Sequence, residues 1–162
     1  MFLLFAVNRD PCTGAAAPEP LDLYLDPALM RLFVFACVHS AGRSQMAAAL
    51  FNRDADPARA RAIAAGTQPA ERVHLVVVEA MREIGIDLAH ARPQKLSDEL
   101  AAQADTLITM GCGEQCPVVP GVTRDDWPLP DPAHQDLATV RTIRDLIENR
   151  IAQLIGEQNL HR

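Results

Sequence analysis

An uninterrupted apolar run followed by a glycine-containing loop constrains the fold of this chain more than any other feature. The run, Leu-Phe-Val-Phe-Ala, spans residues 32–36, and the loop spans 38–42. Apolar runs without alternation are typical of strands that are buried on both faces, as in parallel sheets. Apolar residues at helical spacing then predict a helix over 44–53. The first folded unit is therefore a strand, a tight loop and a helix.

The same order continues along the chain. The later predicted elements are a strand at 61–65, a helix at 71–84, a helix at 97–103, a strand at 106–110, a weaker strand within 122–127 and a helix at 136–156. Gly85 is expected to end the helix before it, and Ser97 and Asp136 are predicted N-caps. This alternation predicts an α/β fold, a three-layer sandwich around a central, mainly parallel four-stranded sheet. Such folds bind ligands beyond the carboxyl ends of their strands.

Length and composition describe one soluble globular domain. The chain has 162 residues, of which 49% are hydrophobic and 22% charged, and it contains no low-complexity tract. The net charge of −6 and the absence of a Lys/Arg cluster argue against nucleic acid and anionic membranes as partners. No apolar run reaches the length of a bilayer span, and residues 1–7 lack the cationic start of a secretory signal. We therefore expect a cytoplasmic protein.

The first 29 residues differ from the rest of the chain. Four prolines lie among one glycine and several alanines, a composition that suits an irregular arm. We predict an N-terminal extension of unknown role at 1–29 and a folded domain at 30–162. Met30 stands just before the first strand and is an alternative start. Cys12 lies in the extension without a partner in sequence.

The strongest chemical signal is Cys37, followed after five residues by Arg43 and Ser44 at the start of the predicted helix. In a loop between a strand and a helix, backbone N–H groups can converge on one point, and the helix N-terminus adds positive potential there. The Arg43 guanidinium can bind two oxygens of a tetrahedral oxyanion. The predicted oxyanion-binding residues are Val38, His39, Ser40, Ala41, Gly42 and Arg43.

Cys37 is the predicted nucleophile of this loop. The field that attracts an oxyanion also favours the thiolate, and a hydrogen bond from Ser44 would add to the effect. The alternative for Cys37 is a buried core thiol, since free cysteine is often fully buried. For His39 the alternatives are lending charge to the loop and packing at its edge, and we favour packing.

This loop resembles the active-site loop of arsenate reductases built on the low-molecular-weight protein tyrosine phosphatase scaffold. Further segments follow the family pattern in the same order, at 65–67, 81–87, 109–112 and 126–132. The resemblance covers about residues 31–156. It implies the fold of that family and the reduction of arsenate to arsenite.

The resemblance also implies a thiol cascade. Cys112 would attack a Cys37–arsenic adduct, releasing arsenite and leaving a disulfide, and Cys116 would then take over the bond to Cys112. The family implies no bound cofactor and an external thiol reductant. Thioredoxin is expected over low-molecular-weight thiols such as mycothiol or glutathione. Phosphate and sulfate are the expected competing oxyanions.

Asp131 matches the general acid of the family, which protonates the oxygen that leaves arsenic. Without the resemblance, an Asp before Pro132 would be read as a turn residue. Two departures stand out: Ser40 replaces an asparagine that holds the loop in relatives, and Ala48 and Ala64 stand where some relatives bind potassium. We therefore expect no potassium dependence.

Four alternatives use the same residues differently. A zinc site at Cys112 and Cys116 is disfavoured because structural zinc needs four ligands and no second suitable pair exists, so no metal is predicted. A purely structural disulfide is disfavoured in a reducing cytoplasm.

A phosphatase would need only Cys37, Arg43 and Asp131. Against it, the chain has one Trp and one Tyr, and Ala133-His134 stands where phosphatase relatives carry tyrosines. A noncatalytic oxyanion or redox sensor is the fourth alternative.

Overall fold

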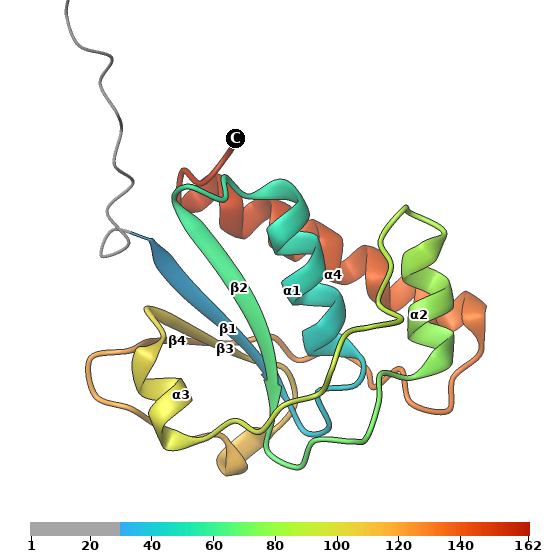
Figure 1. The fold of residues 1–162 in the computed structure, drawn as a ribbon, viewed down its shortest axis with the longest axis horizontal. Helices are drawn as coiled ribbons and strands as arrows, with labels where there is room; N and C mark the ends of the chain where they lie inside the picture. The colour runs from blue at the N-terminus through green and yellow to red at the C-terminus, as the bar shows by residue number, and fades with distance from the viewer. Residues whose placement is uncertain (1–29) are drawn as a thin grey trace, which may run out of the picture.

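The computed structural model describes residues 30–162, so the predicted extension at 1–29, with Cys12, lies outside the described residues. The elements in chain order are β1 (Arg31–Cys37), α1 (Arg43–Asp54), β2 (Ala60–Gly66), α2 (Leu75–Arg82), α3 (Asp98–Gln103), β3 (Thr106–Thr109), the 3-10 helix η2 (Gly113–Gln115), β4 (Thr123–Asp126) and α4 (Leu137–Glu157) (Figure 1). Among residues 30–162, no helix combines the length and the apolar character needed to cross a bilayer.

The four strands form one sheet in the order β2-β1-β3-β4, and every pair is parallel. The α/β prediction is confirmed, and the predicted mainly parallel sheet is parallel throughout. Cys37 pairs with Gly66 in the register, while Thr109 pairs with both Ala36 and Asp126. The carboxyl ends of all four strands therefore meet at one edge of the sheet. This is the edge where the sequence predicts the ligand-binding residues.

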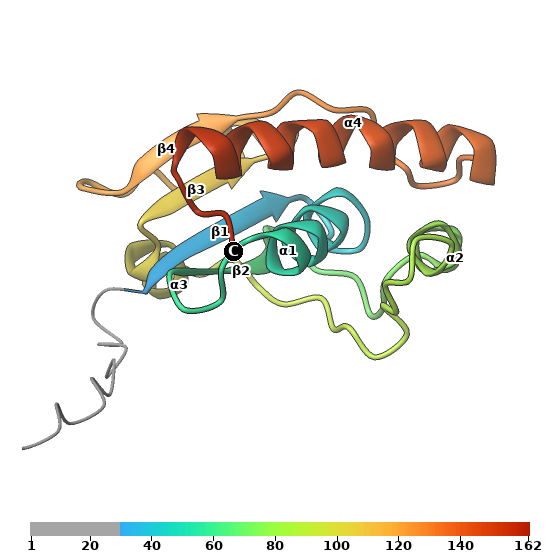
Figure 2. The same cartoon turned by 90° about the horizontal axis from the view of Figure 1, so that it is seen from above.

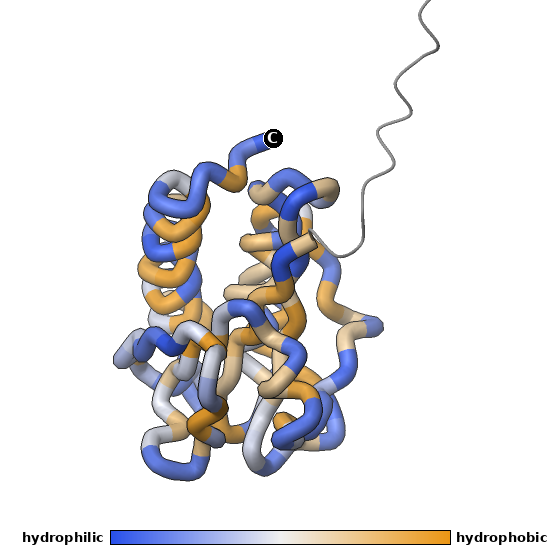
Figure 3. The backbone as a smooth tube through the Cα atoms, turned by 90° about the vertical axis from the view of Figure 1, so that its left-hand side faces the viewer, coloured by the Kyte–Doolittle hydropathy of each residue, from blue (hydrophilic) through white to orange (hydrophobic). Residues whose placement is uncertain are grey.

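Helices cover both faces of the sheet, which gives the three predicted layers (Figure 2). Side chains of β1 alternate between these faces: Phe33, Phe35 and Cys37 lie on the side of α1 and α4, and Leu32, Val34 and Ala36 lie on the side of α3. Along α4, apolar and polar residues alternate as expected for a helix with one buried side (Figure 3). The two faces of β1 thus belong to two separate cores.

Most predicted elements are confirmed, with ends that shift by one or two residues. The exception is the helix expected at 71–84, because α2 begins only at Leu75. The preceding residues are held by the loop after β1, where the Ala70 N–H donates to His39 O and the His74 N–H donates to Ala41 O, both at 2.9 Å. These hydrogen bonds to a distant loop keep residues 71–74 out of the helix. A local apolar pattern cannot reveal such bonds.

Both predicted N-caps are confirmed. The Ser97 side chain accepts a hydrogen bond from Leu100 N, and the Asp136 side chain accepts one from Thr139 N. Hydrogen bonds from the Thr139 side chain and backbone hold the pKa of Asp136 below its usual value. The stabilisation of the folded state by this cap is therefore fully present above the pKa that Asp136 has in the unfolded chain. It is lost as the pH falls through the lower pKa that Asp136 has in the folded state.

We expect Asp136→Ala to lower the urea midpoint at pH 7, because the first turn of α4 loses its cap. The difference from wild type should shrink as the pH falls below 3.8, the usual pKa of the group. Urea unfolding curves between pH 3 and 7 measure both effects. Gln135→Ala, at the neighbouring exposed position, is the control, and an equal loss of stability there would contradict a capping role.

Candidate active site

In the loop between β1 and α1, hydrogen bonds hold the backbone carbonyl groups pointing away from the inside of the loop. From Cys37 to Gly42, the carbonyls accept hydrogen bonds in turn from Thr67 N, Gln68 N, Ala70 N, Gln45 Nε2, His74 N and Met46 N. Within the described part of the chain, the backbone N–H groups from 39 to 44 donate no hydrogen bond. Because each peptide unit is planar, fixing the carbonyls outward turns the N–H groups toward the inside of the loop. The loop is thus built as an anion cradle.

Cys37 and Ser44 meet at this cradle. Cys37 ends β1, is buried and is not disulfide-bonded, and its Sγ lies 3.1 Å from Ser44 Oγ. Gly42, which precedes α1, gives the helix no side-chain cap. The first N–H groups of α1 are therefore open to the loop, and a negative charge there is stabilised by the helix N-terminus.

Arg43 connects the cradle to the loop between β4 and α4. Its guanidinium donates to Leu129 O at 3.0 Å and lies 3.3 Å from Asp131 Oδ2. Its Nε is buried and has no hydrogen-bond partner in the described residues. A buried N–H group without a partner is rare. Nε and the adjacent Nη2 can therefore present two N–H groups to an oxyanion.

Asp131 lies at the open side of the site. Its carboxylate is 49% exposed, pairs with Arg43 and accepts a hydrogen bond from Ala133 N at 2.9 Å. The structure thus places the predicted acid next to the predicted oxyanion residue. Trp127 lies behind this loop in the core, where its Nε1 donates to Asp125 Oδ2 at 2.9 Å and its ring packs near Phe35.

Sequence reasoning missed three supporting residues. Gln45 holds the loop at Ser40, which has a φ of 50°, by donating from Nε2 to its carbonyl at 2.9 Å and its hydroxyl at 3.3 Å. A Cβ on Gly66 would lie 2.6 Å from Val38 O, and a Cβ on Gly111 would lie 2.5 Å from an Arg43 nitrogen. The available signals were the glycine that ends β2 and the glycine that follows β3. Only the fold shows what these two glycines accommodate.

We expect Gly66→Ala to weaken binding of phosphate or arsenate by at least about tenfold, because a methyl group at Gly66 must displace the cradle. Isothermal titration with either anion measures the effect. Gly156→Ala in α4 is the matched control, since its new Cβ would meet nothing closer than 3.8 Å. Equal affinities in wild type and Gly66→Ala would show that the loop tolerates the displacement.

Imidazoles surround the mouth of the site. A Cβ on Gly42 would lie 2.5 Å from Pro132 and 3.6 Å from the His74 ring. Burial lowers the pKa of His74; the Asp131 carboxylate acts against this shift, while His39 and His134 add to it. Burial thus favours the neutral form of the His74 imidazole. His39 is exposed on this loop, and its packing at the loop edge stays a prediction.

Cys112 and Cys116 form a disulfide on the other side of the sheet. Both are buried with Leu32, Val34 and Ala36, whereas Cys37 belongs to the opposite core. The Cys112 sulfur lies 4.0 Å from Ala36 O, alongside the strand that carries Cys37. Among residues 30–162, no three His, Cys, Asp or Glu side chains come together as a metal-binding group. The two sulfurs are bonded to each other rather than placed as ligands.

Comparison with known proteins agrees with this geometry. The model of the family described as low molecular weight phosphotyrosine protein phosphatase matches residues 32–162. A putative arsenate reductase of Halobacterium salinarum is 39% identical over 131 residues, which cover 78% of this chain and 92% of that protein. A glutaredoxin arsenate reductase of Synechocystis sp. is 30% identical over 131 residues, covering 79% and 98%.

A solved structure gives the same result. The Corynebacterium glutamicum thioredoxin-dependent arsenate reductase Cg_ArsC1' superposes with a TM-score of 0.71 at 34% identity, over 83% of this chain and 64% of that chain. The resemblance seen in the sequence is confirmed. The chain therefore belongs to the low molecular weight phosphotyrosine protein phosphatase family, and the three relatives described above carry arsenate reductase names.

Proposed function

We propose that this protein reduces arsenate to arsenite through a cascade of Cys37, Cys112 and Cys116. The observation that carries the proposal is the disulfide-bonded pair Cys112 and Cys116, which lies alongside β1, the strand that ends in the free Cys37 of the oxyanion cradle. Hydrolysis of a phosphate ester needs one nucleophilic cysteine, whereas reduction of arsenic(V) to arsenic(III) needs two electrons, which two thiols supply by forming a disulfide.

In the first step the Cys37 thiolate attacks arsenate bound in the loop. A sulfur–arsenic bond forms and one arsenic–oxygen bond breaks. Asp131 donates a proton so that the oxygen leaves as water. Arg43 and the inward N–H groups hold the other oxygens, and the Ser44 hydroxyl donates to the sulfur before attack.

In the second step the Cys112 thiolate attacks the sulfur of Cys37. A Cys37–Cys112 disulfide forms, and the electron pair of the sulfur–arsenic bond passes to arsenic, which leaves as arsenite. The Cys116 thiolate then attacks Cys112, which releases the Cys37 thiolate and leaves the Cys112–Cys116 disulfide. Because Cys37 and Cys112 belong to opposite cores in the oxidised pair, residues 111–116 must change conformation between these steps.

Two glycines allow this change. Gly111 and Gly113 flank Cys112 and have positive φ angles of 90° and 56°. Glycine interconverts between such conformations and ordinary ones at little steric cost. The segment is also short of regular structure, with η2 covering only three residues. These residues are the proposed hinge that carries Cys112 from the first disulfide to the second.

Thioredoxin is the proposed reductant. Cys116 lines a cavity of about 590 Å³ on the face opposite Cys37, together with Thr67 and Lys95, and Val118 beside it is 79% exposed. Cys116 itself is buried, so a protein dithiol would reach it through this cavity when residues 111–116 change conformation, without entering the oxyanion site. Relatives are named for both thioredoxin and glutaredoxin, so glutathione with glutaredoxin, and mycothiol, are the other arms of the test.

The test supplies arsenate, NADPH, thioredoxin reductase and thioredoxin. We expect continuous NADPH oxidation with wild type, far beyond one equivalent of protein. NADPH oxidation that stops after one equivalent would indicate the sensor alternative. NADPH oxidation only with glutaredoxin or mycothiol would show that thioredoxin is not the reductant, while the cascade itself would stand. Absence of oxidation with every reductant would overturn the proposal.

Trapped disulfides test the order of the steps. After one turnover, mass spectrometry should find Cys37–Cys112 in Cys116→Ser and Cys112–Cys116 in wild type. Free thiols at both loop cysteines in wild type would contradict the proposed sequence. Phosphate and sulfate should inhibit arsenate reduction competitively.

A phosphatase remains the second candidate, with less support. Trp127 is part of the core, and the mouth carries His74 and Pro132 at Gly42. Among the described residues, this leaves no phenylalanine, tyrosine or tryptophan at the mouth to form a wall for a phosphotyrosine ring. Hydrolysis of p-nitrophenyl phosphate that far outruns arsenate reduction would reverse this ranking.

A further inference from the structure

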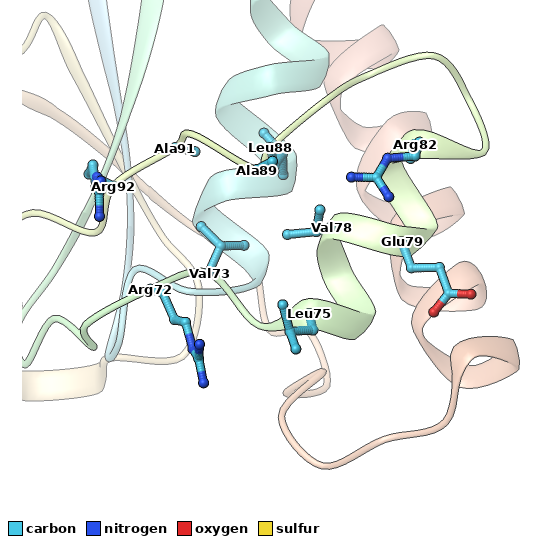
Figure 4. Close-up of a pocket in the computed structure, with 10 residues that line it drawn as sticks. All are labelled: Arg72, Val73, Leu75, Val78, Glu79, Arg82, Leu88, Ala89, Ala91 and Arg92. Carbon is cyan, nitrogen blue, oxygen red and sulfur yellow. The ribbon is translucent and has the colours of Figure 1, made fainter.

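A second cavity lies beside the oxyanion loop, between α2 with the residues leading into it and the segment 88–92 (Figure 4). Its volume is about 440 Å³, within the range of pockets that hold small organic molecules. Val73, Val78 and Leu88 are buried and line it, and Leu75, which is 70% exposed, extends the apolar lining to the rim. The cavity thus offers a mostly apolar floor that opens to solvent.

Three arginines surround this floor from both sides. Arg72 and Arg82 stand before and at the end of α2, and Arg92 stands on the opposite wall (Figure 4). In the part of the chain that the structure describes, the side chains of Arg72 and Arg92 form no ion pair. Arg82 lies 3.7 Å from Asp87, but both side chains are more than half exposed, so this pair holds the guanidinium only weakly.

The local charge opposes that of the whole chain. Glu79 is the only carboxylate among the lining residues, and in Figure 4 it points away from the cavity. The lining therefore carries a surplus of positive charge on a chain of net charge −6. Guanidinium groups bind carboxylate, phosphate and sulfonate oxygens in pairs, and an apolar floor gains free energy by covering hydrocarbon.

We propose that this cavity binds a small amphipathic organic anion. An aromatic or branched apolar body would pack on Val73, Val78 and Leu88, and its single anionic head would pair with Arg72 or Arg92 at the rim. An inorganic oxyanion lacks the body, and an uncharged hydrocarbon lacks the head, so each should bind weakly. The inference does not depend on arsenate chemistry.

The cavity is separate from the oxyanion loop although its walls touch it. His74, which follows Val73, donates its N–H to Ala41 O at 2.9 Å, and Gln45 Nε2 lies 3.5 Å from Arg92 O. No residue of the cradle lines the cavity. An oxyanion in the loop should therefore leave the cavity open.

The probe for this test is 1-anilinonaphthalene-8-sulfonate, an aromatic body with one sulfonate, titrated onto the full chain and followed by fluorescence and calorimetry. We expect one saturable site. N-phenyl-1-naphthylamine, the same body without the sulfonate, and inorganic sulfate should each bind at least about tenfold more weakly, because each lacks one half of the recognition.

Variants identify the cavity. Arg72→Met with Arg92→Met keeps most of the apolar stems and should weaken the probe at least about tenfold. Arg61→Met with Arg150→Met, at exposed positions outside the cavity, is the matched control and should bind like wild type. Ala89→Phe, at an exposed lining position, should block the cavity while circular dichroism and the melting temperature stay unchanged.

Two results would overturn the proposal. Binding that is unaffected by both the arginine pair and Ala89→Phe would place the probe elsewhere on the surface. Displacement of the probe by millimolar arsenate or phosphate would place it on the oxyanion loop.

Discussion

Replacing Cys112 with serine is expected to abolish arsenite release while leaving arsenate binding at its wild-type affinity. The cradle is built from residues 37–44 and contacts outside the Cys112 loop, so capture of the anion does not need the second thiol. Without that thiol, no attack on the Cys37–arsenic adduct can occur and arsenic keeps its oxidation state. Arsenite measured by chromatography, with calorimetry for binding, separates the two effects.

Cys12→Ser is the matched control, because Cys12 has no assigned role. It should release arsenite at the wild-type rate. Cys37→Ser should lose both arsenite release and any hydrolysis of p-nitrophenyl phosphate. Undiminished arsenite release by Cys112→Ser would mean that another thiol reduces arsenic, and the cascade would have to be abandoned.

Replacing Arg43 with lysine is expected to lower kcat/KM for arsenate by roughly 10²–10³-fold, the usual effect of removing one oriented oxyanion donor. Lysine keeps the positive charge but loses the buried Nε–H and the planar pair of donors. It also cannot bridge Leu129 O and Asp131 in the same way. The loss should therefore exceed what charge alone predicts.

Arg150→Lys, an exposed arginine of α4, serves as the control and should change kcat/KM little. Steady-state assays with the physiological reductant in excess measure both variants. A value for Arg43→Lys within about threefold of wild type would show that the site needs only a positive charge.

Local patterns were sufficient for the parts of this protein that depend on neighbouring residues. The buried run of β1, the helix that follows it and the caps at Ser97 and Asp136 all follow from residues within one turn of each other. The pairing of Cys37 with Ser44 follows likewise, because one loop and one helical turn bring them together. For the same reason the oxyanion loop was the clearest site in the sequence.

Contacts between distant segments explain what the sequence did not reveal. Residues 71–74 look helical by pattern, but the N–H groups of Ala70 and His74 donate to carbonyls of the β1–α1 loop. Gly66 is adjacent to the cradle only because β2 lies beside β1. β4 was only weakly predicted because its four residues are all exposed and carry no apolar alternation. Which sheet face holds Cys112 also depends on the path of the loop after β3.

The six outward carbonyls of the oxyanion loop bear on substrate discrimination. Because its peptide dipoles are fixed before binding, the loop is preorganised for a tetrahedral dianion. It therefore keeps the same conformation whichever tetrahedral anion binds. Phosphate and arsenate share that shape and charge, so neither should be excluded at the moment of capture. Selectivity for arsenic would then arise after binding, because thiols can reduce arsenate but not phosphate. Cellular phosphate would act as a competitive inhibitor that is always present.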